Sequence, residues 1–163
     1  MPGISNTVSG VTTRLVEDMV HAVARAIDED RLETFPDFFA ADGTYRIASR
    51  FNVERGFQFA QMYCASRGMI IDRIVSLRRA TVFAGHRYRH LLSGIFVEPG
   101  EDGELRVCAN YLVVRTVDDG VPLLFSSGEY RDRIVIENGQ ALFRERLVIL
   151  DSKGIDTALV IPL

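Results

Sequence analysis

One histidine and one aspartate are the residues of this sequence best suited to acid–base chemistry. His90 lies in a segment whose pattern predicts a strand, and Asp72 lies in one whose pattern predicts a helix. If a fold turned both side chains into one interior, either could serve as a general base, and burial would shift its pKa. A tyrosine would then act as the acid, and the candidates for this pocket are Tyr45, Tyr63, Tyr111 and Tyr130.

A structural interpretation of the same residues competes with the catalytic one. Asp72 would pair with an arginine such as Arg89 and tie a helix to the sheet. His90 would form hydrogen bonds in the core or in an interface. Because structural ion pairs and catalytic pairs look alike in a sequence, we favour the structural interpretation. The residues expected on the same strand face as His90 are Tyr88, Leu92 and Phe96.

The histidines and cysteines limit the metals that this chain could hold. His86 and His90 have a spacing that would suit a shared metal on a helix, but their segment is predicted to be a strand. No glutamate follows His86, as the zinc-protease pattern requires. With Cys64 and Cys108 alone, one copy cannot supply four cysteine ligands to an iron–sulfur cluster. The two Cys-His motifs of a Rieske centre and the glycine-rich nucleotide loops are also missing, so we expect no metal, cofactor-binding or catalytic residue here.

Composition and charge are those of an ordinary globular protein. Of 163 residues, 47% are hydrophobic and 25% charged, and the formal net charge is -3, which provides no basic surface for nucleic acid. No apolar stretch approaches a membrane span, and the segment from Met1 to Gly10 lacks the basic and apolar regions of a signal peptide. We therefore expect a cytoplasmic protein in which both cysteines are buried and reduced.

The first half of the chain is predicted to be mostly helical. Apolar residues at three- and four-residue steps predict helices over 13–28 and 68–79, and Thr12 or Thr13 could cap the first. A short helix would begin at Asp30 and end or kink at Phe35, since Pro36 follows. The alternating pattern of 56–65 predicts a strand that pairs with another over 44–48. The apolar face of the first helix would consist of Val16, Met19, Val20, Val23 and Ile27.

The second half predicts four long antiparallel strands, over 87–98, 104–118, 121–137 and 140–150. Glycine-containing turns separate them, and Asn138-Gly139 and Asp119-Gly120 are strong hairpin signals. Strands of this length usually bend, and isolated glycines at 94 and 128 are candidate bulges. A tail over 157–163 would add an edge strand or dock on a neighbour. Leu105, Val107, Ala109, Tyr111 and Val113 would share one strand face.

The order of these elements predicts one α+β domain over 1–163, with a flexible segment over 1–11. Helices ahead of an antiparallel sheet are typical of this class, and a bent sheet wrapped over them would form a cone with an apolar mouth. Dense charges on the last two strands indicate a solvated or subunit-facing surface. The arginines that we assign to this outer surface are Arg131, Arg133, Arg144 and Arg146.

Several short motifs resemble, in order and spacing, the small (β) subunits of aromatic-ring-hydroxylating dioxygenases. The resemblance covers about residues 12 to 163, and Phe-Pro-Asp-Phe-Phe over 35–39 and the closing Ile161-Pro162-Leu163 are most similar to systems acting on salicylate, anthranilate or terephthalate. The other motifs are Asp42-Gly43-Thr44-Tyr45, Ile71-Asp72-Arg73, Tyr88-Arg89-His90, Ser127-Gly128-Glu129-Tyr130 and the stretch over 147–152.

The resemblance implies a nuclear-transport-factor-2-like, or cystatin-like, cone fold and a non-catalytic role. It implies a partner α subunit that carries a Rieske cluster and a mononuclear iron, three copies of each subunit, and self-association as a trimer. The alternative is a free-standing dehydratase or isomerase, or a ligand-binding module, built on the pocket around Asp72 and His90. Both hypotheses stay open at this point, because one fold hosts many functions.

Overall fold

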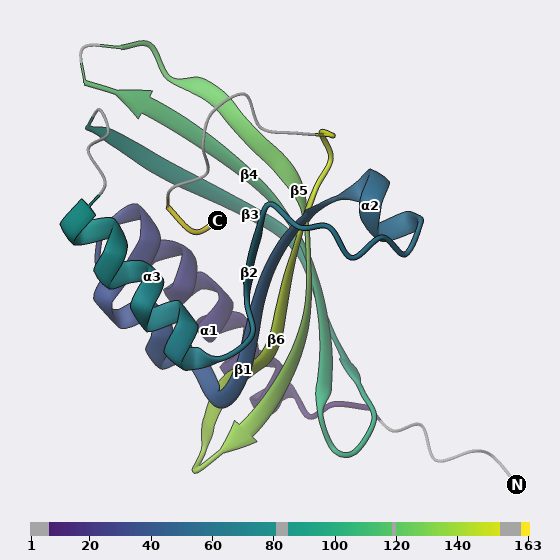
Figure 1. The fold of residues 1–163 in the computed structure, drawn as a ribbon. Helices are drawn as coiled ribbons and strands as arrows, with labels where there is room; N and C mark the ends of the chain where they lie inside the picture. The colour runs from purple at the N-terminus through teal and green to yellow at the C-terminus, as the bar shows by residue number, and fades with distance from the viewer. Residues whose placement is uncertain (1–6, 81–84, 119, 154–160) are drawn as a thin grey trace, which may run out of the picture.

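Helices α1 (Gly10–Asp28) and α3 (Arg67–Ala80) lie side by side against one face of a curved six-stranded sheet (Figure 1). The computed structural model describes residues 7–80, 85–118, 120–153 and 161–163. We call the face that carries α1 and α3 the helix side of the sheet, and the opposite face the open side. The other elements are η1 (Leu32–Phe38), β1 (Phe39–Ser49), α2 (Arg50–Glu54), β2 (Met62–Cys64), β3 (His86–Pro99), β4 (Leu105–Val117), β5 (Leu123–Glu137) and β6 (Gln140–Leu150).

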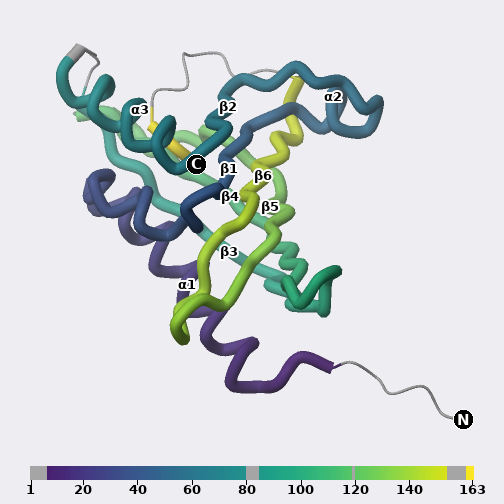
Figure 2. The backbone as a smooth tube through the Cα atoms, turned by 60° about the horizontal axis from the view of Figure 1, so that its bottom comes forward, coloured from purple at the N-terminus to yellow at the C-terminus, as the bar shows by residue number. Residues whose placement is uncertain are grey.

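The sheet has the strand order β2-β1-β6-β5-β4-β3, and all neighbours are antiparallel except β1 and β6. The expected α+β class and the four long strands of the second half are therefore confirmed. The short α2 packs on β1 and β6, away from the other two helices (Figure 2). No helix in the described part of the chain is long and apolar enough to cross a membrane.

The predicted apolar face of α1 is confirmed. Val16, Val20 and Val23 are fully buried, and Met19 and Ile27 are nearly so. The helix begins at Gly10, three residues earlier than expected, because Ser9 rather than a threonine caps it and its hydroxyl accepts a hydrogen bond from the Thr12 amide. Residues 10 and 11 are therefore helical.

The second helix differs from the prediction at its end. It is a 3-10 helix over Leu32–Phe38 with Pro36 inside, so it passes the point where we expected it to stop. Its tighter turns bond residue i to i+3, and proline therefore removes no i−4 bond there. Phe35 consequently enters the core, where its ring lies 5.2 Å from Phe39 and 5.3 Å from Tyr45.

The expected strand over 56–65 is only partly correct. Three residues, Met62–Cys64, pair with β1 as predicted, with Tyr45 opposite Cys64. Residues 56–61 form no strand, and the preceding α2 was not predicted. A side-chain cap explains that helix, because Ser49 accepts a hydrogen bond from the Asn52 amide at 3.2 Å.

The glycine predictions had mixed outcomes. Gly94 is a bulge, with a φ of 58° and a register shift between Ser93 and Phe96. The shift turns Phe96 to the open side, so its expected position beside His90 is wrong. Gly128 is not a bulge, and the shifts in β5 fall elsewhere. Asn138 and Gly139 both have positive φ, as their hairpin turn requires, whereas Asp119 lies outside the described residues.

The core lies between the helices and the helix side of the sheet, and the end of the chain contributes to it. Ile161 and Leu163 are buried in this core, so the described end of the tail packs on its own chain, while 157–160 lie outside the described residues. Val107, Ala109, Tyr111 and Val113 are buried together as expected. Cys64 is buried, but Cys108 is exposed because its position on β4 faces the open side, which corrects that prediction.

Candidate functional site

Three of the expected pocket tyrosines meet inside the core. The rings of Tyr111 and Tyr130 are stacked with centroids 4.7 Å apart, and the Tyr111 hydroxyl lies 3.0 Å from Ser126 Oγ. Burial raises the pKa of Tyr130 to about 12 and raises that of Tyr45 further. These phenols therefore stay protonated near neutral pH, where they act as hydrogen-bonding groups. Tyr63, by contrast, is 57% exposed on the open side.

Tyr45 holds the end of the chain. Its hydroxyl donates to the Leu163 carbonyl at 3.2 Å and accepts from the Leu163 amide at 2.9 Å. We expect Tyr45→Phe to lower the free energy of unfolding by about 1–3 kcal/mol, because two buried backbone groups lose their partner. Urea titration would measure this, with the exposed Tyr63→Phe as the matched control. Equal stability of the two variants would contradict the prediction.

His90 is oriented by Asp28, a residue that the sequence did not single out. The side chain of His90 is fully buried, and its Nδ1 lies 2.6 Å from Asp28 Oδ1. Asp28 also accepts the His90 backbone N–H at 2.9 Å. A carboxylate at Nδ1 favours the tautomer with a proton there, which leaves Nε2 as an acceptor. Among the described residues, Nε2 has no hydrogen-bond partner.

Asp72 and His90 are not brought together. Asp72 lies on the exposed surface of α3, away from the core, and within the described part of the chain no ion pair joins it to Arg89. Nothing in the sequence indicated that Asp28 would contact His90. Asp28 is the last residue of α1, and it meets His90 only because α1 packs along the edge strand β3. The expected pocket is therefore divided into a tyrosine cluster and a separate Asp28–His90 pair.

Arg146 is in the core, which corrects its assignment to the outer charged surface. Its side chain is 1% exposed, and Nη1 lies 3.6 Å from Asp132 Oδ2, whose side chain is also 1% exposed. The guanidinium carbon lies 3.7 Å from the Tyr130 ring centroid. A register shift between Arg133 and Ile134 causes this position, since it turns two successive residues, Arg144 and Glu145, away from the core.

Asp132 should make stability depend on pH. Burial raises its pKa from 3.8 to about 7, although the charge of Arg146 lowers it. The folded chain therefore binds this proton more tightly than the unfolded chain, and the stabilisation, complete below 3.8, is lost as pH rises through about 7. We expect Asp132→Asn to remove a decline of up to about 1.4 kcal/mol per pH unit. Denaturant titrations between pH 3.8 and about 7 would measure the free energy of unfolding of the wild type and of Asp132→Asn. If both fell with pH by the same amount, the prediction would be wrong.

The other three arginines are partly exposed, as expected for an outer surface. Arg131 pairs with Glu129. Arg133 lies 2.8 Å from Glu104 and 3.6 Å from Glu145. Arg144 pairs with Asp42. Each of these arginines already has an acidic partner within the chain, so this surface carries little unpaired charge.

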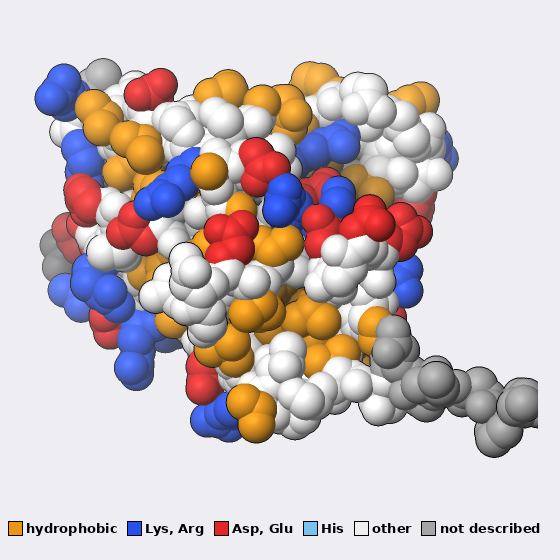
Figure 3. Space-filling view, turned by 90° about the horizontal axis from the view of Figure 1, so that it is seen from below, with side chains coloured by type: hydrophobic (Ala, Val, Ile, Leu, Met, Phe, Trp, Pro, Cys, Tyr) orange, Lys and Arg blue, Asp and Glu red, His pale blue; other side chains and the backbone are white. Residues whose placement is uncertain are grey.

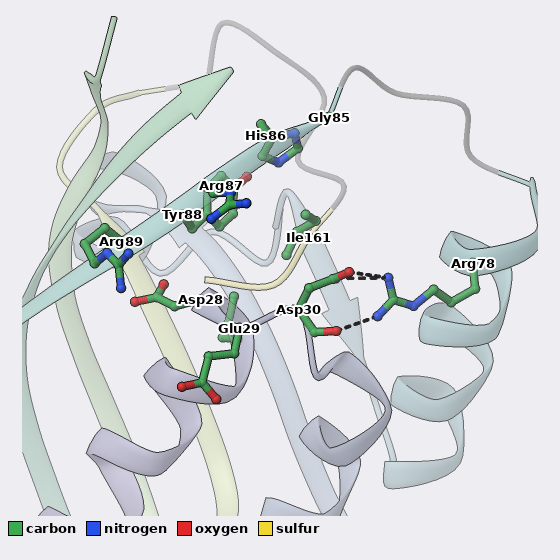
Figure 4. Close-up of a pocket in the computed structure, with 11 residues that line it drawn as sticks. Asp28, Glu29, Asp30, Arg78, Gly85, His86, Arg87, Tyr88, Arg89 and Ile161 are labelled. Atoms are coloured by element: carbon green, nitrogen blue, oxygen red, sulfur yellow. Dashed lines mark hydrogen bonds and ion pairs between the residues drawn. The ribbon is translucent and has the colours of Figure 1, made fainter. Parts of the chain in front are cut away.

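Two neighbouring clefts of about 580 and 590 Å³ lie at the end of α1 and share Asp28, Glu29 and Arg89. Figure 4 shows the first, where Asp30 binds Arg78 across the opening from α3. The lining is mostly charged, unlike the apolar lining of typical small-molecule sites. In the described ranges, no three histidine, cysteine or acidic side chains are placed to hold a metal ion.

Comparisons with known proteins identify relatives along most of the chain. The model of the SnoaL-like domain matches residues 12–146. The anthranilate 1,2-dioxygenase small subunit of Burkholderia cepacia is 34% identical over 84% of this chain and 85% of its own length. The beta 1 subunit of the terminal oxygenase component of terephthalate 1,2-dioxygenase from Comamonas sp. is 32% identical over 87% of this chain and 92% of its own.

A solved structure agrees with these relatives. A crystal structure assigned as the beta subunit of an aromatic-ring-hydroxylating dioxygenase from Novosphingobium aromaticivorans superposes with a TM-score of 0.85 at 34% identity. The superposition covers 94% of the present chain and 97% of the chain in that crystal structure. The expected nuclear-transport-factor-2-like fold is thereby confirmed.

Proposed function

We propose that this chain is the non-catalytic small subunit of an aromatic-ring-hydroxylating dioxygenase. The premise is its family: the chain belongs to the SnoaL-like domain family and, within it, to the small subunits of these dioxygenases. The observation that carries the proposal is the similarity along nearly the whole length of both chains. A fold alone would not suffice, since folds of this kind host several functions.

The interior of the described structure supports a structural role. Tyr45 uses its hydroxyl on the backbone of Leu163, Tyr111 uses its hydroxyl on Ser126, and Arg146 lies against Tyr130 and Asp132. These groups are occupied by one another. A free-standing enzyme that used Asp72 and His90 together would need side chains that lie apart in this fold. The Asp28–His90 pair instead ties the end of α1 to the edge of the sheet.

The metal centres that catalyse the oxygenation would be on a larger partner subunit. We propose an α subunit that carries a Rieske cluster and a mononuclear iron, three copies of each subunit, and a trimer of this chain within the assembly. The two free cysteines agree with a reducing, cytoplasmic location. Relatives named for anthranilate and terephthalate suggest an aromatic carboxylic acid as the substrate of the complex. Arg131, Arg133 and Arg144 remain our candidates for contacts between subunits.

Co-purification tests the proposal. The tagged chain would be isolated from its host after growth on aromatic acids, and the visible spectrum of the preparation would be recorded. We expect a larger chain to co-purify and to bring the brown absorbance of an iron–sulfur cluster. A colourless preparation of this chain alone, from cells that are growing on an aromatic acid, would contradict the proposal. Catalytic activity of that colourless preparation would instead favour a free-standing enzyme.

A further inference from the structure

The cleft of about 580 Å³ between the end of α1 and the start of β3 contains two arginines without partners. Arg87 and Arg89 line this cleft and are exposed, and both extend from β3 toward the end of α1 (Figure 4). Within the described ranges, neither side chain has a hydrogen bond or an ion pair. Alternate residues of a strand lie on one side of it, roughly 6.6 Å apart. Both guanidinium groups can therefore reach one small anion.

The acidic side chains of the same cleft already have partners within the chain. The pairs are Asp28 with His90, Glu29 with Arg25 and Arg31, and Asp30 with Arg78. The first pair matters most for Arg89, because the backbone and ring N–H groups of His90 occupy both oxygens of Asp28. The charges of this lining are thus largely neutralised by one another, and the two arginines remain for a ligand.

An apolar surface lies beside the two arginines. Its three side chains are only 5–8% exposed, and the ring of Tyr88 is stacked on that of Phe125 with centroids 5.2 Å apart. This surface is therefore already formed without a ligand, and the cleft has the volume of a small-molecule site. We call these three side chains the apolar floor, and they are Ile27, Tyr88 and Ile161.

Charges on another face of the molecule are arranged differently. Seen from below, acidic and basic side chains are mixed around hydrophobic ones and form no field of one sign (Figure 3). A small anion on that face would meet both signs of charge together. In the cleft, it would meet two arginines whose charge no side chain of the described chain neutralises in an ion pair.

We propose that this cleft binds a small aromatic carboxylate, with its carboxylate held by Arg87 and Arg89 and its ring on the apolar floor. The planar N–H groups of arginine match the geometry of a carboxylate. A single negative charge suits the cleft better than a phosphate dianion, because the three acidic residues would repel two charges more strongly. The inference goes beyond the proposed function, since it concerns a site on this chain alone.

Four probes test the chemistry of the site on the unmodified chain. Isothermal titration calorimetry near neutral pH would compare benzoate with benzamide, which keeps the ring but has no charge. Acetate keeps the charge without a ring, and inorganic phosphate is the competing anion. We expect benzoate to bind about tenfold more tightly than benzamide, because charge-assisted hydrogen bonds are lost with the charge. Acetate and phosphate should also bind more weakly than benzoate, since neither has a ring for the apolar floor.

Three substitutions test the location. Arg87→Gln and Arg89→Gln should each raise the Kd for benzoate by about tenfold. The matched control is Arg106→Gln, which removes an exposed arginine near Glu98, at the other end of β3, and should leave the Kd unchanged. Circular dichroism would verify that each variant is folded.

Several results would overturn the inference. They are an absence of benzoate binding, benzamide, acetate or phosphate binding as tightly as benzoate, or an equal loss of affinity in all three variants. Unchanged affinity in both Arg87→Gln and Arg89→Gln would do the same. Co-purification of a larger iron-bearing chain is a separate measurement. If that chain co-purifies and benzoate does not bind, the proposed function stands without this site.

Discussion

Replacing Asp132 with alanine is expected to lower the free energy of unfolding by about 3–5 kcal/mol. The substitution leaves Arg146, whose side chain is 1% exposed, as an unpaired charge in the core. The carboxylate is the only acidic group of the described chain with an ion pair to this guanidinium. The cost should become smaller as pH rises through the Asp132 pKa of about 7, because ionisation of this buried carboxyl already destabilises the wild type there.

The matched controls separate the loss of the pair from the loss of a carboxylate. Asp72→Ala removes an exposed carboxylate on α3 and should change stability by less than about 0.5 kcal/mol. The double variant Asp132→Leu/Arg146→Met should recover most of the loss, because apolar residues of similar volume replace a buried ion pair without a charge. Urea unfolding of the four proteins measures these differences. If Asp132→Ala were as stable as the wild type, the ion pair between Asp132 and Arg146 would not be important for stability.

Gly128→Ala is expected to destabilise the sheet by about 3 kcal/mol, near the upper end of the usual cost of overpacking. A Cβ at this position would overlap the backbone oxygen of Ile149 on β6 and lie 3.0 Å from Tyr111 Cε1. Because the oxygen belongs to the backbone of a paired strand, it cannot move without disturbing the ladder between β5 and β6. The result would show as a lower urea midpoint.

A second glycine provides the control of opposite sign. Gly68 lies near the start of α3, and a Cβ there would meet only Ser66 Oγ at 3.7 Å. Gly68→Ala should therefore raise stability by up to about 1 kcal/mol through helix propensity. If Gly128→Ala were tolerated as well as Gly68→Ala, close approach would not be the reason for glycine at 128.

The sequence alone determined the features that depend on local pattern. The apolar stripe of α1, from Val16 to Ile27, predicted a helix and the face that it buries, since that spacing fits one helical face. Asn138-Gly139 predicted a hairpin, because both residues adopt positive φ. Alternation along β4 predicted which residues face the core. The short motifs that resemble dioxygenase small subunits, such as the one over 35–39, indicated the family by their order and spacing, and the relatives of this chain then established it.

Only the tertiary structure decided which side chains meet. Arg146 and Arg144 are indistinguishable as charges in the sequence, but a register shift in β6 buries one and exposes the other, and a shift of this kind reverses the direction of side chains. Asp28 reaches His90 only because α1 packs along β3.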